Sequence, residues 1–271
     1  MAATVGRQEE TSTGLGRLVI GALGLAVGVL LVRGALTRAR RPKPRAAPGS
    51  RAPGGRKTQS KQAVELVARM LQSRGPLEQF RLYLVGFRPL RDDPRTQTEV
   101  HLYCHFLNDD FAQCVVFDGP GPDARLIGVE YRISERLYDR LLPEEQSYWH
   151  PSNYELLSAQ VVAPGLPPRV ERELVRLLLN GYAKTWQLWT TDGSDPAGRS
   201  LPFGDARLAW SFNHEGEIEP ALLGARDERM GVDTQRRRAQ REDLRWLAAP
   251  QEGEALLRDQ FAPGPSLDPE D

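Results

Sequence analysis

Cysteine is scarce in this chain, and that scarcity limits the kind of scaffold it can form. Of 271 residues, two are cysteines, Cys104 and Cys114. Two cysteines in a chain of this length exclude a disulfide-rich fold. Their spacing would allow one bridge across a hairpin in an oxidising compartment. We favour two reduced, partly buried thiols, because free cysteine is usually buried.

The signatures of common active sites are also missing. There is no Gly-x-Ser-x-Gly elbow, no Cys-x-x-Cys pair and no His-Glu-x-x-His motif. The glycines at 119 and 121 flank a proline and lack the lysine of a phosphate-binding loop. Cys104 and His105 are neighbours, which on a strand point to opposite faces, so the histidine is not expected to activate the thiol. The catalytic residues therefore stay unknown, no cofactor is indicated, and enzymatic activity is left open.

The net charge of the chain is zero, but its basic and acidic residues are unevenly distributed along the sequence. The chain has 36 basic and 36 acidic residues. Residues 1–61 hold 12 Lys and Arg against two acids, whereas the remainder holds 24 against 34. Because the larger part is acidic, it is a poor candidate for binding nucleic acid through its own surface.

One apolar stretch precedes this acidic part. After a short polar N-terminus, residues 1–17, an unbroken run of apolar residues and glycine covers residues 18–32 and extends to about 36. As a helix the run spans about 22 Å, short of the roughly 30 Å hydrocarbon core. A cleaved signal peptide and a segment that does not span the bilayer are the alternatives. We predict an uncleaved anchor at residues 18–36, which makes this a single-pass membrane protein.

A basic segment, residues 37–60, follows the apolar stretch. It consists largely of Pro, Gly, Ser, Ala and Arg, with almost nothing to bury, and therefore indicates a flexible linker. Positive charge marks the cytoplasmic side of a span, so the C-terminal domain is expected in the cytoplasm. The linker either docks on anionic lipid or acts as a topology signal and spacer. Both readings make a membrane or lipid surface the expected partner; protein partners stay unknown.

Residues 61–248 are expected to form one globular domain of the α+β class, with a mostly antiparallel sheet and flanking helices. Alternating or continuous apolar runs predict strands, which cover residues 100–106, 114–117, 126–133, 154–163, 184–191 and 207–212. Helical spacing and capping residues predict helices at residues 61–74, after Ser134, from Pro143, at 170–178 with Gly181 as the cap, and at 233–247. Residues 91–98 are expected to form a loop, and residues 80–87 fit either a strand or a helix. Residues 249–271 are expected to form an acidic disordered tail.

The densest group of metal-ligand types lies around His101 and His105. These two imidazoles share a face on a strand as well as on a helix. With His150 and Glu130 as further ligands, they are the candidate metal site for zinc or iron. The alternative is that the histidines are hydrogen-bonded sheet and loop residues, while Glu130 pairs with a cross-strand cation.

Several blocks of sequence resemble the oil-body-associated protein family. The blocks occur in one order between about residues 79 and 247. They are Tyr103-Cys104, Asn108 to Phe111, Gln113-Cys114, Phe117-Asp118, Ala124 to Tyr131 with Ile133-Ser134, Leu142 to Gln146 with Trp149-His150, Tyr154-Glu155, Tyr182 with Lys184 to Trp186, and Arg226 to Arg229 with Gly231-Val232. The resemblance implies a compact domain that associates with lipid bodies, with relatives in seed tissue and in microbes. It implies no reaction and carries over no catalytic residues.

Differences from the family also inform the prediction. Family members place histidines around the Tyr-Cys block, and the stretch from His101 to Phe106 is a rearranged version, which weakens a metal site built on His105. The anchor and linker lie outside the likeness, so this chain resembles a microbial-type member with an added N-terminal anchor. The leading hypothesis is a membrane-anchored, lipid-surface module without catalysis, at a lipid droplet or a membrane. The alternatives are a metal-dependent enzyme acting on a small or lipidic substrate, and a scaffold for a protein partner.

Overall fold

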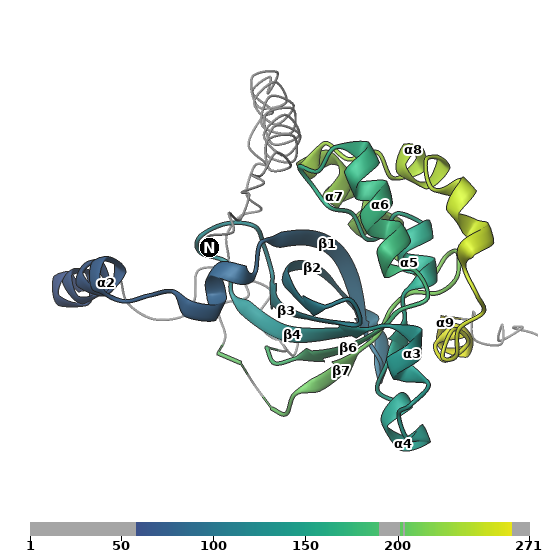
Figure 1. The fold of residues 1–271 in the computed structure, drawn as a ribbon, viewed down its shortest axis with the longest axis horizontal. Helices are drawn as coiled ribbons and strands as arrows, with labels where there is room; N and C mark the ends of the chain where they lie inside the picture. Colours follow the sequence, from purple (N-terminus) through teal and green to yellow (C-terminus); the bar gives the residue numbers. More distant parts are fainter. Residues whose placement is uncertain (1–57, 190–200, 203, 262–271) are drawn as a thin grey trace, which may run out of the picture. The chain divides into compact units, whose positions relative to one another are not determined.

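The computed structural model describes residues 58–189, 201–202 and 204–261. Seven antiparallel strands form the sheet (Figure 1). They are β1 (Leu82–Leu90), β2 (Asp93–Asn108), β3 (Phe111–Phe117), β4 (Leu126–Ile133), β5 (His150–Pro151), β6 (Tyr182–Gln187) and β7 (Arg207–Ala209). The predicted α+β class and single domain with an antiparallel sheet are confirmed. The prediction did not specify that this sheet closes into a barrel.

The sheet closes on itself. Its order is β4-β3-β2-β1-β7-β6-β5, and β4 also pairs with β6. Six strands therefore form a barrel, and the two-residue β5 extends it beside β6. Closure removes the free edges that an open sheet would present.

The strands place alternate side chains inside the barrel. In β3, Ala112, Cys114 and Val116 are buried, whereas the residues between them are partly exposed. A period of two is what a strand with one covered face requires. Cys114 and Val116 join Leu102 of β2 and Leu156, from a short helix, in the main core.

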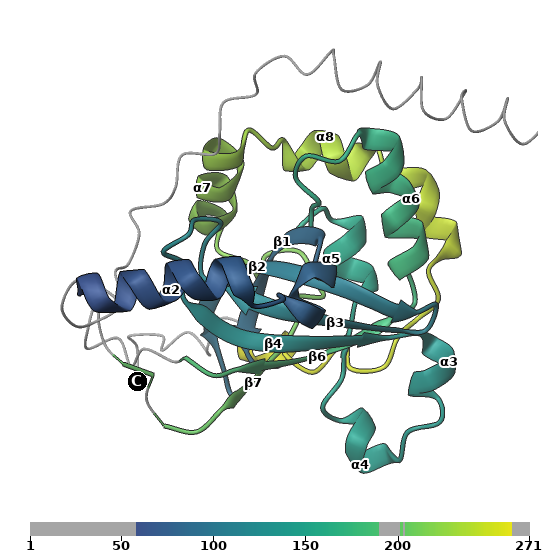
Figure 2. The ribbon, with the colours of Figure 1, turned by 60° about the vertical axis from the view of Figure 1, so that its left-hand side comes forward.

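Helices cover the barrel unevenly. They are α2 (Gln59–Leu71), α3 (Glu135–Tyr138), α4 (Pro143–Gln146), α5 (Asn153–Leu157), α6 (Pro168–Leu178), α7 (Pro220–Met230), α8 (Thr234–Ala239) and α9 (Arg258–Phe261), with 3₁₀ turns η1 (Gly75–Gln79) and η2 (Glu242–Leu247). Figures 1 and 2 show α5 to α8 gathered on one side of the barrel, with α3 and α4 on another. Leu174 and Val175 of α6 and Leu244 of η2 complete the main core.

Three predicted elements were wrong. Residues 154–163 hold the helix α5, not a strand; short apolar runs cannot be assigned by periodicity alone. Only Val162 forms a bridge, with Val85 of β1. Residues 91–98 are largely the beginning of β2, and Pro94 is tolerated near the strand's first residue. The helix expected at 233–247 is broken between α8 and η2, where the buried Arg241 guanidinium donates to the carbonyls of Leu156 and Val161.

The C-terminal boundary lies later than predicted. Gln251 is buried and Leu257 is fully buried, so residues 249–261 pack on the domain instead of beginning a disordered tail at 249. The Gln251 side chain accepts from the backbone of Ser152 and Asn153 and donates to the carbonyl of Gly181. The predicted segments 1–17, 18–36 and most of 37–60 lie outside the described residues.

The localisation prediction has to be corrected. Across residues 58–189, 201–202 and 204–261, no helix has the length and apolar character that a membrane span needs. The longest helix there, α2, has 13 residues and spans about 20 Å, against a hydrocarbon core of roughly 30 Å. A single-pass membrane protein with a cytoplasmic domain is therefore not supported, and the proposed anchor lies outside the described residues.

Candidate functional site

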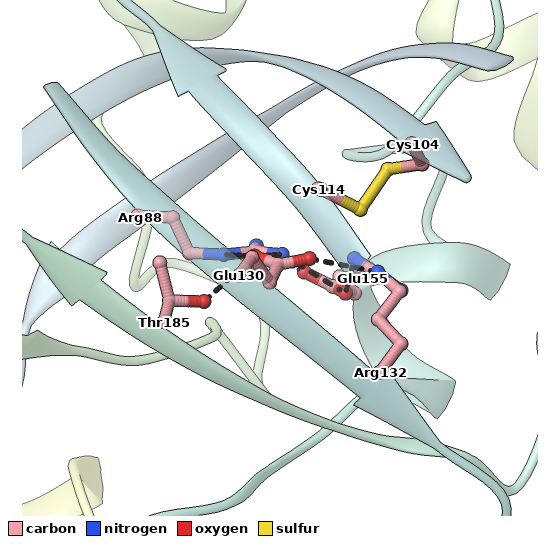
Figure 3. Close-up of a disulfide and its surroundings, with 7 residues drawn as sticks. All are labelled: Arg88, Cys104, Cys114, Glu130, Arg132, Glu155 and Thr185. Atoms are coloured by element: carbon pink, nitrogen blue, oxygen red, sulfur yellow. Dashed lines mark hydrogen bonds and ion pairs between the residues drawn. A yellow bond between two sulfur atoms is a disulfide. The ribbon is translucent and has the colours of Figure 1, made fainter. Parts of the chain in front are cut away.

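Four buried charged side chains meet inside the barrel (Figure 3). Arg88 comes from β1, Glu130 and Arg132 from β4, and Glu155 from α5. We call these four residues the ionic cluster. Arg88 and Glu130 are fully buried, and Arg132 is 6% exposed. Charges are rarely buried unless they are paired, so their geometry decides whether the fold tolerates them.

The ionic cluster is paired on every side. Glu130 accepts from Arg88 Nε at 2.9 Å and from Arg132 Nε at 2.7 Å. Glu155 accepts from Arg132 Nη2 at 3.2 Å and also pairs with Arg88 Nη1. Two guanidinium groups and two carboxylates therefore alternate around a closed ring, and their formal charges balance.

The ring shifts the pKa values of Glu130 and Arg88. Burial alone would raise the pKa of Glu130, but Arg132 and Arg88 outweigh burial and hold that pKa well below its usual range. Burial would lower the pKa of Arg88, but the carboxylates of Glu130 and Glu155 outweigh burial and raise that pKa above its ordinary value. Glu130 and Arg88 are therefore held in their charged forms.

His150 and Thr185 extend the cluster. The Thr185 hydroxyl donates to Glu130 Oε2 at 2.6 Å, and His150 Nε2 lies 3.1 Å from the same hydroxyl oxygen. Because the hydroxyl proton is given to Glu130, Nε2 carries a hydrogen and donates it to Thr185. Burial and the nearby Arg88 lower the pKa of His150 well below its usual range, so the ring stays neutral.

The candidate metal ligands do not converge. Glu130 and His150 come close through Thr185, but His101 and His105 lie on the outward face of β2, where His101 Nδ1 is 2.7 Å from the Tyr83 hydroxyl. His101 also pairs with Glu99 at 3.1 Å. No group of three His, Cys, Asp or Glu residues in the described part of the chain is placed to hold a metal ion. The metal hypothesis gains no support here and stays a prediction.

The two cysteines form a disulfide beside the ionic cluster (Figure 3). Cys104 and Cys114 are opposed in the β2–β3 register, with their Cα atoms 4.0 Å apart. Cys114 is also opposite Glu130 in the next strand pair. The favoured reading of two reduced thiols was wrong, because pairing of the two strands places the sulfur atoms face to face.

A cavity of about 330 Å³ adjoins the ionic cluster at Arg132. It is lined by the β2–β3 turn with the adjoining strand ends, the end of β4 with the beginning of α3, residue 152, and the end of α6 with the following turn and the first residue of β6. Arg132 is opposite Ala112 in β3 and Ala183 in β6. Such small neighbours leave room beside the guanidinium.

Helix α2 carries an apolar face that is exposed in the described part of the chain. Its apolar side chains fall on one arc of the helix, as an amphipathic sequence requires, and none of its residues is buried. The exposed fractions range from 51% to 80% for Val64, Leu66, Val67, Met70 and Leu71. Thr58 caps the helix by accepting from the backbone of Lys61.

Sequence reasoning found only Glu130 of the ionic cluster, although it foresaw a cross-strand cation as its partner. Arg88, Arg132 and Glu155 were missed. The usable signal was the charge within apolar strands: Arg88 follows Phe87 in β1, and Glu130 and Arg132 share one face of β4. Charged residues at inward positions indicate buried ion pairs.

The fold and the site together define a closed antiparallel barrel with a balanced ionic cluster in its interior and an amphipathic helix before the first strand. The family described as "Protein of unknown function (DUF1264)" matches residues 74–245. Oil body-associated protein 2A of Arabidopsis thaliana is 38% identical over 185 residues, which is 68% of this chain and 73% of the relative. Oil body-associated protein 1A of Zea mays is 33% identical over 190 residues, 70% of this chain and 77% of the relative.

The chain therefore belongs to the oil body-associated protein family. No solved structure matches it. The matched family region begins at residue 74, after α2.

Proposed function

We propose that this protein is a non-catalytic module that binds the surface of a lipid body, and that α2 is the element that lies on the lipid. The observation that carries the proposal is the uncovered apolar face of α2. An amphipathic helix of this kind buries its apolar face at the boundary between headgroups and acyl chains. The names of the relatives, oil body-associated proteins, support a lipid body as the surface.

The sequence before α2 supplies charge of the matching sign. Residues 37–58 hold basic residues and no acidic ones, with the charges at Arg38, Arg40, Arg41, Lys43, Arg45, Arg51, Arg56 and Lys57. Near an anionic lipid surface each such residue contributes about 1 kcal/mol. Attachment that combines apolar burial with basic charge is stronger than either alone.

The test is flotation of the full chain with triolein droplets coated with phosphatidylcholine, with or without phosphatidylserine. The α2 variant carries Val64→Gln, Val67→Gln and Met70→Gln. We expect at least about a tenfold loss of droplet binding, because partial burial of three such side chains supplies several kcal/mol.

A matched control makes the same kind of change outside α2. Leu142→Gln, Val170→Gln and Leu256→Gln replace three exposed apolar residues on other parts of the domain. This control should float like the unchanged protein. Undiminished flotation of the α2 variant would refute α2 as the docking element, and failure of the unchanged protein to float would refute lipid binding itself.

The metal-dependent enzyme remains an untested alternative. No observation among the described residues favours it over the lipid-surface module, because the proposed ligands lie on two faces of the sheet.

A further inference from the structure

The cavity at Arg132 has features of a ligand site. Its volume, about 330 Å³, falls at the lower end of the range for small-molecule sites. Its two innermost polar residues, Arg132 and Ser152, are 6% and 1% exposed. Side chains at its mouth, such as Phe106 and Leu177, are exposed. The site is thus a pocket with a polar inner end.

Two donors at this inner end have no partner within the described residues. Arg132 uses Nε and Nη2 for Glu130 and Glu155, which leaves Nη1 without a hydrogen bond there. The Ser152 backbone donates to Gln251, but its hydroxyl makes no hydrogen bond in the described part of the chain. Neither atom is among the fully buried unpaired polar atoms of the described residues, and both residues line the cavity, where a ligand oxygen can accept from them.

The charge around the pocket restricts the ligand's head. The charges of the ionic cluster already balance, so Arg132 offers a hydrogen bond without net positive charge to neutralise an anion. The mouth is acidic, because Asp109, Asp110 and Glu135 outnumber Arg136, which itself pairs with Asp110. An anionic head is disfavoured by this mouth, and a cationic head by the inner guanidinium.

Apolar side chains also line the cavity. Phe111, Ile133 and Leu178 line the pocket beside the exposed residues of its mouth. Such a surface suits a short hydrocarbon chain, whose transfer from water is favourable by about 0.8 kcal/mol for each buried methylene.

We propose that this cavity binds an uncharged amphiphile, with an ester or alcohol oxygen at Arg132 and Ser152 and a short acyl chain along the apolar walls. The site is separate from α2, so the inference goes beyond the proposed docking function. A module resting on a lipid body would thereby also hold a single neutral lipid molecule.

The experiment is calorimetric titration of the full chain with 1-monodecanoylglycerol below its micelle concentration, compared with decanoate and with glycerol. Saturable binding of one monodecanoylglycerol per chain is expected, with decanoate at least about tenfold weaker. Ser152→Ala should weaken binding by about fivefold or more, the size of one neutral hydrogen bond.

Two matched variants on α6 distinguish the pocket from other surfaces. Leu177→Trp adds bulk at the mouth and should abolish binding, whereas Val170→Trp makes a similar change on the same helix away from the lining and should have no effect. Both positions are exposed, so both variants are expected to fold.

The outcomes separate this proposal from the docking function. The α2 variant described above should bind monodecanoylglycerol normally even though it no longer floats. Tighter binding of decanoate would overturn the uncharged head, and equal binding by the Leu177→Trp variant would overturn the site. If the unchanged protein does not bind monodecanoylglycerol, the cavity proposal is overturned. The docking role of α2 is then still decided by the flotation experiment.

Discussion

Glu130 is the residue on which the interior of the barrel depends most. It accepts hydrogen bonds from two buried guanidinium groups and from the Thr185 hydroxyl. A buried ion pair is not by itself a large source of stability, because desolvation offsets much of the attraction. Removing one member is costly, since its partners are left charged and unpaired in the interior.

Glu130→Gln is therefore expected to lower the free energy of unfolding by about 3–5 kcal/mol. The amide keeps the shape of the side chain but removes the charge that offsets Arg88 and Arg132. Urea unfolding of the full chain measures the change. Glu173→Gln is the matched control, because Glu173 pairs with Arg176 on the exposed surface of α6 and should cost less than about 1 kcal/mol. Equal effects of the two substitutions would contradict the assigned role of Glu130.

The Cys104–Cys114 disulfide lies beside Glu130 and adds to the stability of the same part of the barrel. Because Cys114 is opposite both Cys104 and Glu130 in the strand registers, the bond lies against the β4 position that carries the cluster. A bridge that closes so short a loop is expected to contribute about 3 kcal/mol through the unfolded state.

At the scale of elements, the pairing of β4 with β6 turns a sheet into a barrel. Gly128 allows this approach: a Cβ at this position would lie 2.5 Å from the carbonyl oxygen of Trp186. Only glycine permits two backbones to come so close. The same pairing brings Thr185 opposite Glu130, so closure of the barrel and assembly of the site depend on one contact.

Gly128→Val is expected to destabilise the fold by at least about 2 kcal/mol, because β4 and β6 must separate to admit the side chain. Thermal and urea unfolding measure the loss. Gly224→Ala, within α7, is the control. No atom lies within 4 Å of the added Cβ, so this change should be neutral or should stabilise the fold by up to about 1 kcal/mol. A Gly128→Val variant with unchanged stability would show that the barrel does not need this close approach.

At the scale of the whole molecule, stability should depend on pH in two stages. Folding lowers the pKa of His150 and of Glu130, so the folded state binds fewer protons than the unfolded state at low pH. The stabilisation is full above the unfolded pKa and is lost as the pH falls. Loss is expected to begin below about 6.5 for His150 and below about 4.3 for Glu130.

The measurement is the free energy of unfolding between pH 8 and pH 3. His150→Gln should remove the slope between about pH 6.5 and 5 that this residue contributes, while the steeper loss below pH 4.3 remains. If the stability of the His150→Gln variant falls between about pH 6.5 and 5 as steeply as that of the unchanged protein, His150 is not a buried neutral residue.

Family membership and the position of helix α2 also belong to this scale. The shared region covers the barrel and most of its helices, whereas α2 precedes it. The family model therefore covers the barrel, and the docking proposal concerns a helix that lies before the residues it matches. The two proposed sites occupy different parts of the molecule and can be tested independently.

The sequence by itself determined the elements whose signals are local. The strand at residues 126–133 and the helix α6 follow from apolar spacing within one contiguous stretch, and the family follows from ordered blocks of residues. Glu130 was identified from the sequence as a candidate metal ligand, with pairing to a cross-strand cation as the alternative.

Only the tertiary structure decided what meets inside the barrel. Arg88 is 42 residues from Glu130 and 67 from Glu155 in the chain, and strand registers and barrel closure bring them together. The same closure opposes the two cysteines, sends His101 and Glu130 to opposite faces, and leaves the cavity beside Arg132. Such contacts depend on the pairing of distant segments, which the periodicity of one segment does not encode.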